Sequence, residues 1–182
     1  MRKALIALVC PAVCACGPRD TRPDLAKLAE LHKKIAAIDR RVTAASNAYT
    51  GASNAALDHD DRVAIGRAAL ALHDAMEAIR PDAAKLTVPD FKNNDVGEQA
   101  GQVLASLLVE IDADADAAIS LQAMIDPAHP SPGEITALQS AQDRANNASI
   151  SEGVNLVAAY QDLGITPDRI DTKNGGLKPA KR

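Results

Sequence analysis

The sequence has few aromatic residues and, after residue 16, no cysteine at all. Among its 182 residues there are one Phe, two Tyr and no Trp. A surface on which bases or sugars stack needs aromatic faces, so the chain offers little to such a ligand. All three cysteines lie within the first sixteen residues, which excludes a disulfide framework for the rest of the chain.

Excess positive charge and familiar catalytic patterns are also missing. The chain has 24 acidic and 20 basic residues, a net charge of −4 with neutral histidines. Binding to nucleic acid depends on clustered Lys and Arg, so we expect no nucleic-acid partner. The sequence contains no Gly-x-Ser-x-Gly elbow, no His-Glu-x-x-His motif and no phosphate-binding loop. We therefore predict that the protein is not an enzyme and has no catalytic residues.

The first sixteen residues have their own pattern. Arg2 and Lys3 precede an apolar run over residues 4–9, and small residues follow as far as Cys16. This three-part layout is typical of a secretory signal peptide. The apolar run is too short for a helix that crosses a membrane, which needs about 20 residues.

The end of this segment, Val13-Cys14-Ala15-Cys16, resembles the lipobox of bacterial lipoproteins, in which an aliphatic residue and two small residues precede the lipidated cysteine. Cys14 is an unusual small residue for that motif. The resemblance implies removal of residues 1–15, with Arg2 and Lys3 among them, and lipidation of Cys16, whose several acyl chains would anchor the protein stably to a membrane. Lipoproteins retained in the inner membrane often carry Asp after the cysteine, where this chain has Gly17. The resemblance therefore favours the periplasmic face of the outer membrane.

Beyond the signal segment, apolar residues repeat at alternating spacings of three and four, which indicates amphipathic helices with a coiled-coil-like seam. The seam of the first predicted helix consists of Leu28, Leu31, Ile35, Ile38, Val42, Ala45 and Tyr49. Acidic residues within 58–61 suit the start of a second helix, and Pro81 suits its end. Asp95 with Glu98 resembles a capping box that opens a third helix.

The fourth predicted helix has the clearest boundaries. Ser131-Pro132-Gly133-Glu134 combines an N-cap serine, a proline in the first turn and a glutamate for a capping box. Gly164 followed by Pro167 predicts its end. Residues 146–153 have poor helix propensity, and the apolar direction changes there, so we predict a kink or a break.

These elements predict an all-α fold, an antiparallel up-down four-helix bundle made of two long helical hairpins. The predicted organisation is a signal peptide over residues 1–15, a lipidated tether over 16–23, a bundle domain over 24–165 and a disordered polar tail over 166–182. His32 lies next to the first seam, and we interpret it as an interface residue.

The acidic run on the third helix begins like a calcium loop, with Asp112, Asp114 and Asp116 at alternate positions. The match then fails, because Ala117 replaces the required glycine and Ala123 the required glutamate. Alternate residues on a helix also point in nearly opposite directions, so Asp114 should point away from the other two. We predict no metal site and no cofactor.

These exclusions, with the predicted tether, lead to the hypothesis of a non-enzymatic, lipid-anchored periplasmic protein that binds another protein, as an envelope adaptor or as an inhibitor of the immunity type. One alternative is a bundle that binds a small ligand or a metal, and another is a structural envelope lipoprotein without a specific partner. The predicted contact residues lie in the interrupted stretch, with two acids of the third helix as a second choice: Asn146, Asn147, Ser149, Ser151 and Glu152, then Asp112 and Asp116.

Overall fold

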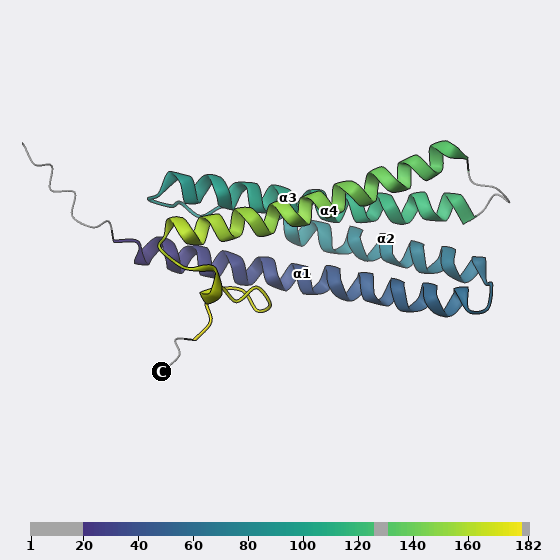
Figure 1. Ribbon diagram of the computed structural model, residues 1–182, viewed down its shortest axis with the longest axis horizontal. Helices are drawn as coiled ribbons and strands as arrows, with labels where there is room; N and C mark the ends of the chain where they lie inside the picture. Colours follow the sequence, from purple (N-terminus) through teal and green to yellow (C-terminus); the bar gives the residue numbers. More distant parts are fainter. Residues whose placement is uncertain (1–19, 126–130, 180–182) are drawn as a thin grey trace, which may run out of the picture.

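The computed structural model describes residues 20–125 and 131–179. Within them the chain forms four α-helices and a short 3-10 helix: α1 Arg22–Leu57, α2 Arg62–Ala84, α3 Asn94–Ile125, α4 Pro132–Asp162 and η1 Pro167–Arg169. The four long helices lie along one axis and alternate in direction (Figure 1). The predicted all-α, up-down four-helix bundle is confirmed. The signal segment and Cys16 lie outside the described residues.

The core is aliphatic and follows the predicted seam of α1. Leu28, Ile35 and Val42 are buried, and they belong to one cluster with Leu107 of α3 and Tyr160 of α4. α1 continues without a break through Gly51 as far as Leu57. The spacing of apolar residues therefore predicted correctly which face of α1 turns inward.

α2 starts as predicted and ends later. Asp61 caps it, since its carboxylate accepts a hydrogen bond from the N–H of Ala64 at 2.9 Å. The predicted end at Pro81 is wrong, because the helix runs on to Ala84. Ile79 and Ala83 lie one turn apart on either side of the proline and are both buried, so core packing holds the last turn in place.

Residues 85–93 form an irregular connection between α2 and α3. A buried carboxylate of α1 holds the end of this connection in place. Asp24 is only 3% exposed and accepts hydrogen bonds from the N–H groups of Lys92 and Asn93, at 3.1 and 3.0 Å. Phe91 is buried in the core beside them. Asp24 thus satisfies two backbone donors just before α3 begins.

α3 begins earlier than the predicted capping box. The side-chain oxygen of Asn93 accepts a hydrogen bond from the N–H of Asp95 at 3.1 Å, and the helix starts at Asn94. The prediction that Asp95 and Glu98 open the helix is therefore wrong, because the capping residue is Asn93, two residues before Asp95. The hydrogen bonds that the N–H groups of Lys92 and Asn93 donate to Asp24 hold Asn93 where its own side chain can serve as the cap.

α4 confirms both predicted boundaries but contains no break. Ser131 and Glu134 form the capping box, with bonds of 3.2 and 2.6 Å. Gly164, with φ of +79°, ends the helix, and the N–H of Ile165 bonds to the carbonyl of Tyr160 at 3.0 Å. The helix is continuous over 146–153. Ala148 in that stretch is buried, so packing outweighs the unfavourable propensity.

The prediction that residues 166–182 are disordered is wrong for residues 166–179, while 180–182 lie outside the described part of the chain. Residues 164–179, here called the C-terminal strap, contain η1 and a two-residue antiparallel bridge between Ile170 and Leu177. Ile170 is buried in the core, which explains the order of a segment that is mostly polar. The strap lies beside α1, at the end where α1 begins and α4 ends (Figure 1).

Candidate functional site

The predicted contact region on α4 divides between two faces. Asn146, Asn147, Ser149 and Ser151 are exposed to solvent, whereas Glu152 is only 8% exposed. On a continuous helix, adjacent residues cannot share one face, so these five side chains do not form a single surface. Four of the predicted contact residues remain accessible, and Glu152 belongs to the interior.

Between the exposed polar residues lies an apolar pair that the sequence analysis did not select. Ile150 and Val154, one helical turn apart, are 65% and 62% exposed. They line a groove of about 600 Å³ whose opposite wall is formed by Ile170 and Thr172 of the strap. The groove could not be foreseen from the sequence, because the strap was expected to be disordered.

A second hollow lies on the other side of α4. It has a volume of about 340 Å³ and is lined by Val109 of α3 together with Arg144, Asn147 and Ser151 of α4. Val109 is itself an exposed apolar residue. The outer face of α4 is thus flanked by apolar surface on both sides, with polar residues at its margins, which is the usual composition of a protein-binding surface.

The alternative contact residues on α3 are engaged within the molecule. Asp112 forms an ion pair with Arg80 of α2, and Asp116 forms one with Arg144 of α4 at 2.8 Å. Both pairs are exposed to solvent, so each contributes little to stability. Because their charges are already matched, these two acids offer less to a partner than the sequence suggested.

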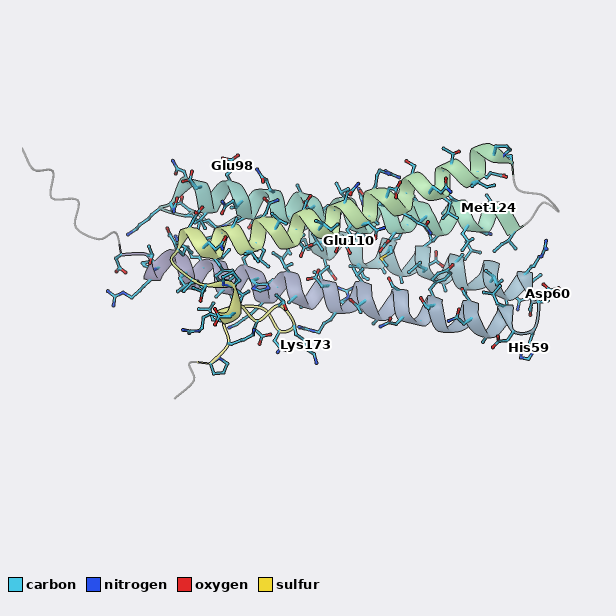
Figure 2. All side chains as sticks on the ribbon, in the orientation of Figure 1. His59, Asp60, Glu98, Glu110, Met124 and Lys173 are labelled. Carbon is cyan, nitrogen blue, oxygen red and sulfur yellow. The ribbon has the colours of Figure 1, made fainter. Side chains whose placement is uncertain are left out.

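Asp114 joins an inner group of acids instead. Asp39 of α1, Glu110 and Asp114 of α3 and Glu152 of α4, here called the acidic waist, lie close enough for their charges to interact. Burial, followed by mutual repulsion, raises the pKa of Glu110 to about 7 and that of Glu152 to about 8. Glu110 lies near the middle of the bundle's length (Figure 2).

The acidic waist contains more acids than compensating groups. Arg40 lowers the pKa of Asp39, but burial has the larger effect and raises it to about 6. A hydrogen bond from Ser149 favours the charged form of Glu110, again against a larger effect of burial. Within residues 20–125 and 131–179, no three or more His, Cys, Asp or Glu side chains are arranged to hold a metal ion. The waist is therefore a string of carboxylates rather than a compact metal-binding cluster.

His32 is an interface residue, as predicted, and its partners are the strap and α4. Its Nδ1 accepts a hydrogen bond from the N–H of Gly176 at 2.9 Å, and the hydroxyl of Tyr160 lies 3.1 Å from the same nitrogen. Burial lowers the pKa of His32 to about 4, with Asp171 opposing the shift. The imidazole is therefore neutral at physiological pH and serves to hold the strap.

No helix in the two described ranges is long and apolar enough to cross a membrane. Comparisons of the chain with protein-family models, with curated proteins and with solved structures find no match. Any functional proposal must therefore rest on this chain's own residues.

Proposed function

We propose that this chain is a lipid-anchored periplasmic protein that acts without catalysis, by binding another protein through the outer face of α4. The observation that carries the proposal is the exposed pair Ile150 and Val154 at the edge of the strap groove. Exposed apolar side chains that gather beside a groove are typical of interaction sites. Polar residues such as Asn147 and Ser151 would form the rim of the interface.

The shape of the site favours an extended apolar segment of the partner, such as one face of an amphipathic helix. The groove between α4 and the strap runs beside two apolar residues that are spaced by one helical turn. A partner helix would place residues at the same spacing into it. A stable interface buries about 1,200–2,000 Å², so the contact would extend from this groove to the hollow at Val109.

The anchoring part of the proposal depends on the lipobox resemblance. The described chain begins only four residues after Cys16, at the end of the bundle where α1 starts. A lipid on Cys16 would hold that end close to the periplasmic face of the outer membrane. α1 has 36 residues and is about 54 Å long, so the rest of the bundle would extend away from its anchor.

The test is a pull-down from solubilised cells with the full chain tagged after Arg182. We expect one stoichiometric partner that is lost when Ile150 and Val154 are both replaced by Asp, because the charges would prevent burial of this face. Val63→Asp is the matched control, since Val63 is 61% exposed on α2. Retention of the partner by the double variant, or its equal loss in the control, would contradict the proposed site.

Cys16→Ser tests the anchor separately from the binding site. The variant should leave the membrane fraction while the purified domain still binds its partner. If the chain that retains Cys16 carries lipid but captures no stoichiometric partner, a structural envelope lipoprotein without a specific partner becomes the better description.

A further inference from the structure

We propose that one side of the bundle docks on the anionic lipid surface of the membrane that carries the anchor. This side, here called the basic face, comprises residues 27–41 of α1, residues 82–85 at the end of α2 and residues 168–178 of the strap. The inference rests on the proposed anchor at Cys16 for the membrane that it names. It goes further, because it gives the folded domain a membrane contact of its own.

The first observation is an excess of positive charge on this face of an acidic protein. The three segments together contain nine Lys or Arg residues and five Asp or Glu residues. The rest of the chain contains 11 basic and 19 acidic residues, so the excess of bases belongs to the basic face. A positive surface on a chain of negative net charge attracts anionic partners at short range.

The second observation is that contacts join the three segments into one surface. The guanidinium of Arg40 donates a hydrogen bond to the carbonyl of Lys173 at 3.1 Å, so the strap lies against this part of α1. Lys173 lies beside α1 in Figure 2. Lys27 and Lys34 of α1 line a hollow of about 410 Å³ together with Lys85, just after α2. Bases that are distant in the sequence are therefore neighbours on the surface.

The third observation is that the central bases have no acidic partner. Lys33, Lys34 and Lys173 are exposed, and their side chains form no ion pair or hydrogen bond with any residue of the described ranges. Among residues 27–41, four bases are fully exposed, whereas Glu30 is the only acid that is. The positive charge is thus available to a partner from outside the molecule.

The position of this face relative to the N-terminus selects a membrane as that partner. Asp20, the first described residue, follows Cys16 by four positions, and four residues span at most about 14 Å. The strap and the start of α1 lie at this same end of the bundle (Figure 1). A lipid on Cys16 would therefore bring the basic face close to phosphate headgroups, with α1 lying along the membrane surface.

The spread of the bases favours a lipid surface over a single small anion. Residues 27–41 extend over about 21 Å of α1, and Lys173 and Lys178 continue the charge across the strap. A discrete anion is held by donors that converge on it. An anionic bilayer instead attracts each Lys or Arg near its surface separately. An extended basic face without a common centre therefore fits a bilayer.

Flotation with vesicles tests the basic face separately from the anchor. One vesicle contains phosphatidylcholine alone, and the other contains phosphatidylcholine and phosphatidylglycerol in equal amounts. Protein purified from membranes should float with both, because its acyl chains insert into either. The chain from residue 16 onward with Cys16→Ser keeps every described residue but has no lipid. It should float only with the anionic vesicles, and less as the salt concentration rises.

A pair of substitutions in the unlipidated chain locates the contact. Lys33→Gln with Lys34→Gln should weaken binding to the anionic vesicles at least about tenfold, since each base near such a surface contributes about fivefold in affinity. Arg62→Gln with Arg67→Gln is the matched control, because it removes the same charge from exposed positions at the opposite end of the bundle. The control should change the affinity less than about twofold. Thermal unfolding checks that both variants fold.

The proposal is overturned if the unlipidated chain does not float with anionic vesicles at low salt. It is also overturned if both pairs weaken binding equally, because net charge alone would then explain it, or if soluble polyglutamate binds more tightly than vesicles of equal charge, because the face would then select an acidic protein. Failure of the protein from membranes to float with neutral vesicles would contradict the anchor instead. Binding of the unlipidated chain to anionic vesicles would still support the basic face.

Discussion

The strap end of the bundle and its acidic waist both bury polar groups, but they differ in whether those groups have partners. At the strap end, His32 accepts from Gly176, and Asp24 accepts from two backbone N–H groups. In the waist, Glu152 is 8% exposed, against 3% for Asp24 and 2% for His32, and the charged groups that act on it are the acids Asp39 and Glu110. The effect of burial on a polar group therefore depends on whether its neighbours are hydrogen-bond donors or other acids.

The presence of partners also predicts how each region responds to pH. His32 has a pKa lowered to about 4, and Glu152 has one raised to about 8, so both prefer their neutral forms. A neutral histidine keeps the acceptor nitrogen that holds the strap. A neutral glutamate only avoids an unfavourable charge. Acid should therefore weaken the strap end, and alkali should weaken the waist.

The largest expected effect comes from removing a satisfied group. Asp24→Ala would leave the N–H groups of Lys92 and Asn93 without an acceptor and should reduce the free energy of unfolding by about 3 kcal/mol. Urea unfolding followed by circular dichroism measures it. Asp20→Ala, at an exposed acid that pairs with Arg22, is the control and should change little. Equal effects of the two variants would show that Asp24 is not a structural anchor.

The second expected effect is a loss of stability as pH rises. Glu110 and Glu152 have folded-state pKa values of about 7 and about 8, above those of the unfolded chain. Their contribution is complete below the unfolded pKa and is lost as pH rises through the folded values. From about pH 6.5 to about pH 8.5, the free energy of unfolding should fall by about 2 kcal/mol. Urea titrations across this range measure the slope.

His32 has the opposite pH dependence, because its folded-state pKa is lowered to about 4. Its contribution to stability is lost as pH falls from about 6.5 to about 4, so it does not affect the range chosen here. Glu152→Gln is the diagnostic variant. It removes the group with the highest pKa of the waist, so the alkaline slope should flatten and the variant should be more stable than the parent at about pH 8.5. An unchanged slope would mean that the waist is not the source of the pH dependence.

The third expected effect concerns the fit of the strap against α1. A Cβ at Gly175 would lie 2.5 Å from Cα of Lys33, and this glycine has φ of +77°. Gly175→Ala should therefore detach the strap and lower stability by about 1–2 kcal/mol. Hydrogen exchange should show faster exchange of the Gly176 amide. Gly153→Ala is the control, since Gly153 is exposed on α4 with open space around it, and it should stabilise the helix slightly.

The smallest expected effect is on the outer face of α3. Asp116→Asn removes an exposed ion pair with Arg144 and should change the free energy of unfolding by less than about 0.5 kcal/mol. Thermal unfolding at low and high salt measures it. A loss as large as that of Asp24→Ala would mean that surface acids and buried acids of this bundle are not distinct classes.

Several helix boundaries could be predicted from the sequence because they depend on neighbouring residues, whereas the predicted boundaries at Pro81 and Asp95 were wrong because packing and Asp24 of α1 decide them. Asp61, Gly164 and the pair Ser131 and Glu134 act on backbone groups within one turn, so a short stretch of sequence is enough to identify them. The seam of α1 follows from its spacing alone. The helix count and the bundle class follow from these signals together.

Only the tertiary structure decided which helices pack against each other. The position of each candidate site follows from that packing. The strap is ordered because Ile170 enters the core and Gly176 reaches His32, 144 residues away in the chain. The acidic waist exists because Glu152, chosen from the sequence as a surface residue, faces Glu110 and Asp39 from other helices. Contacts between distant segments depend on how helices rotate and pack, which no local pattern encodes.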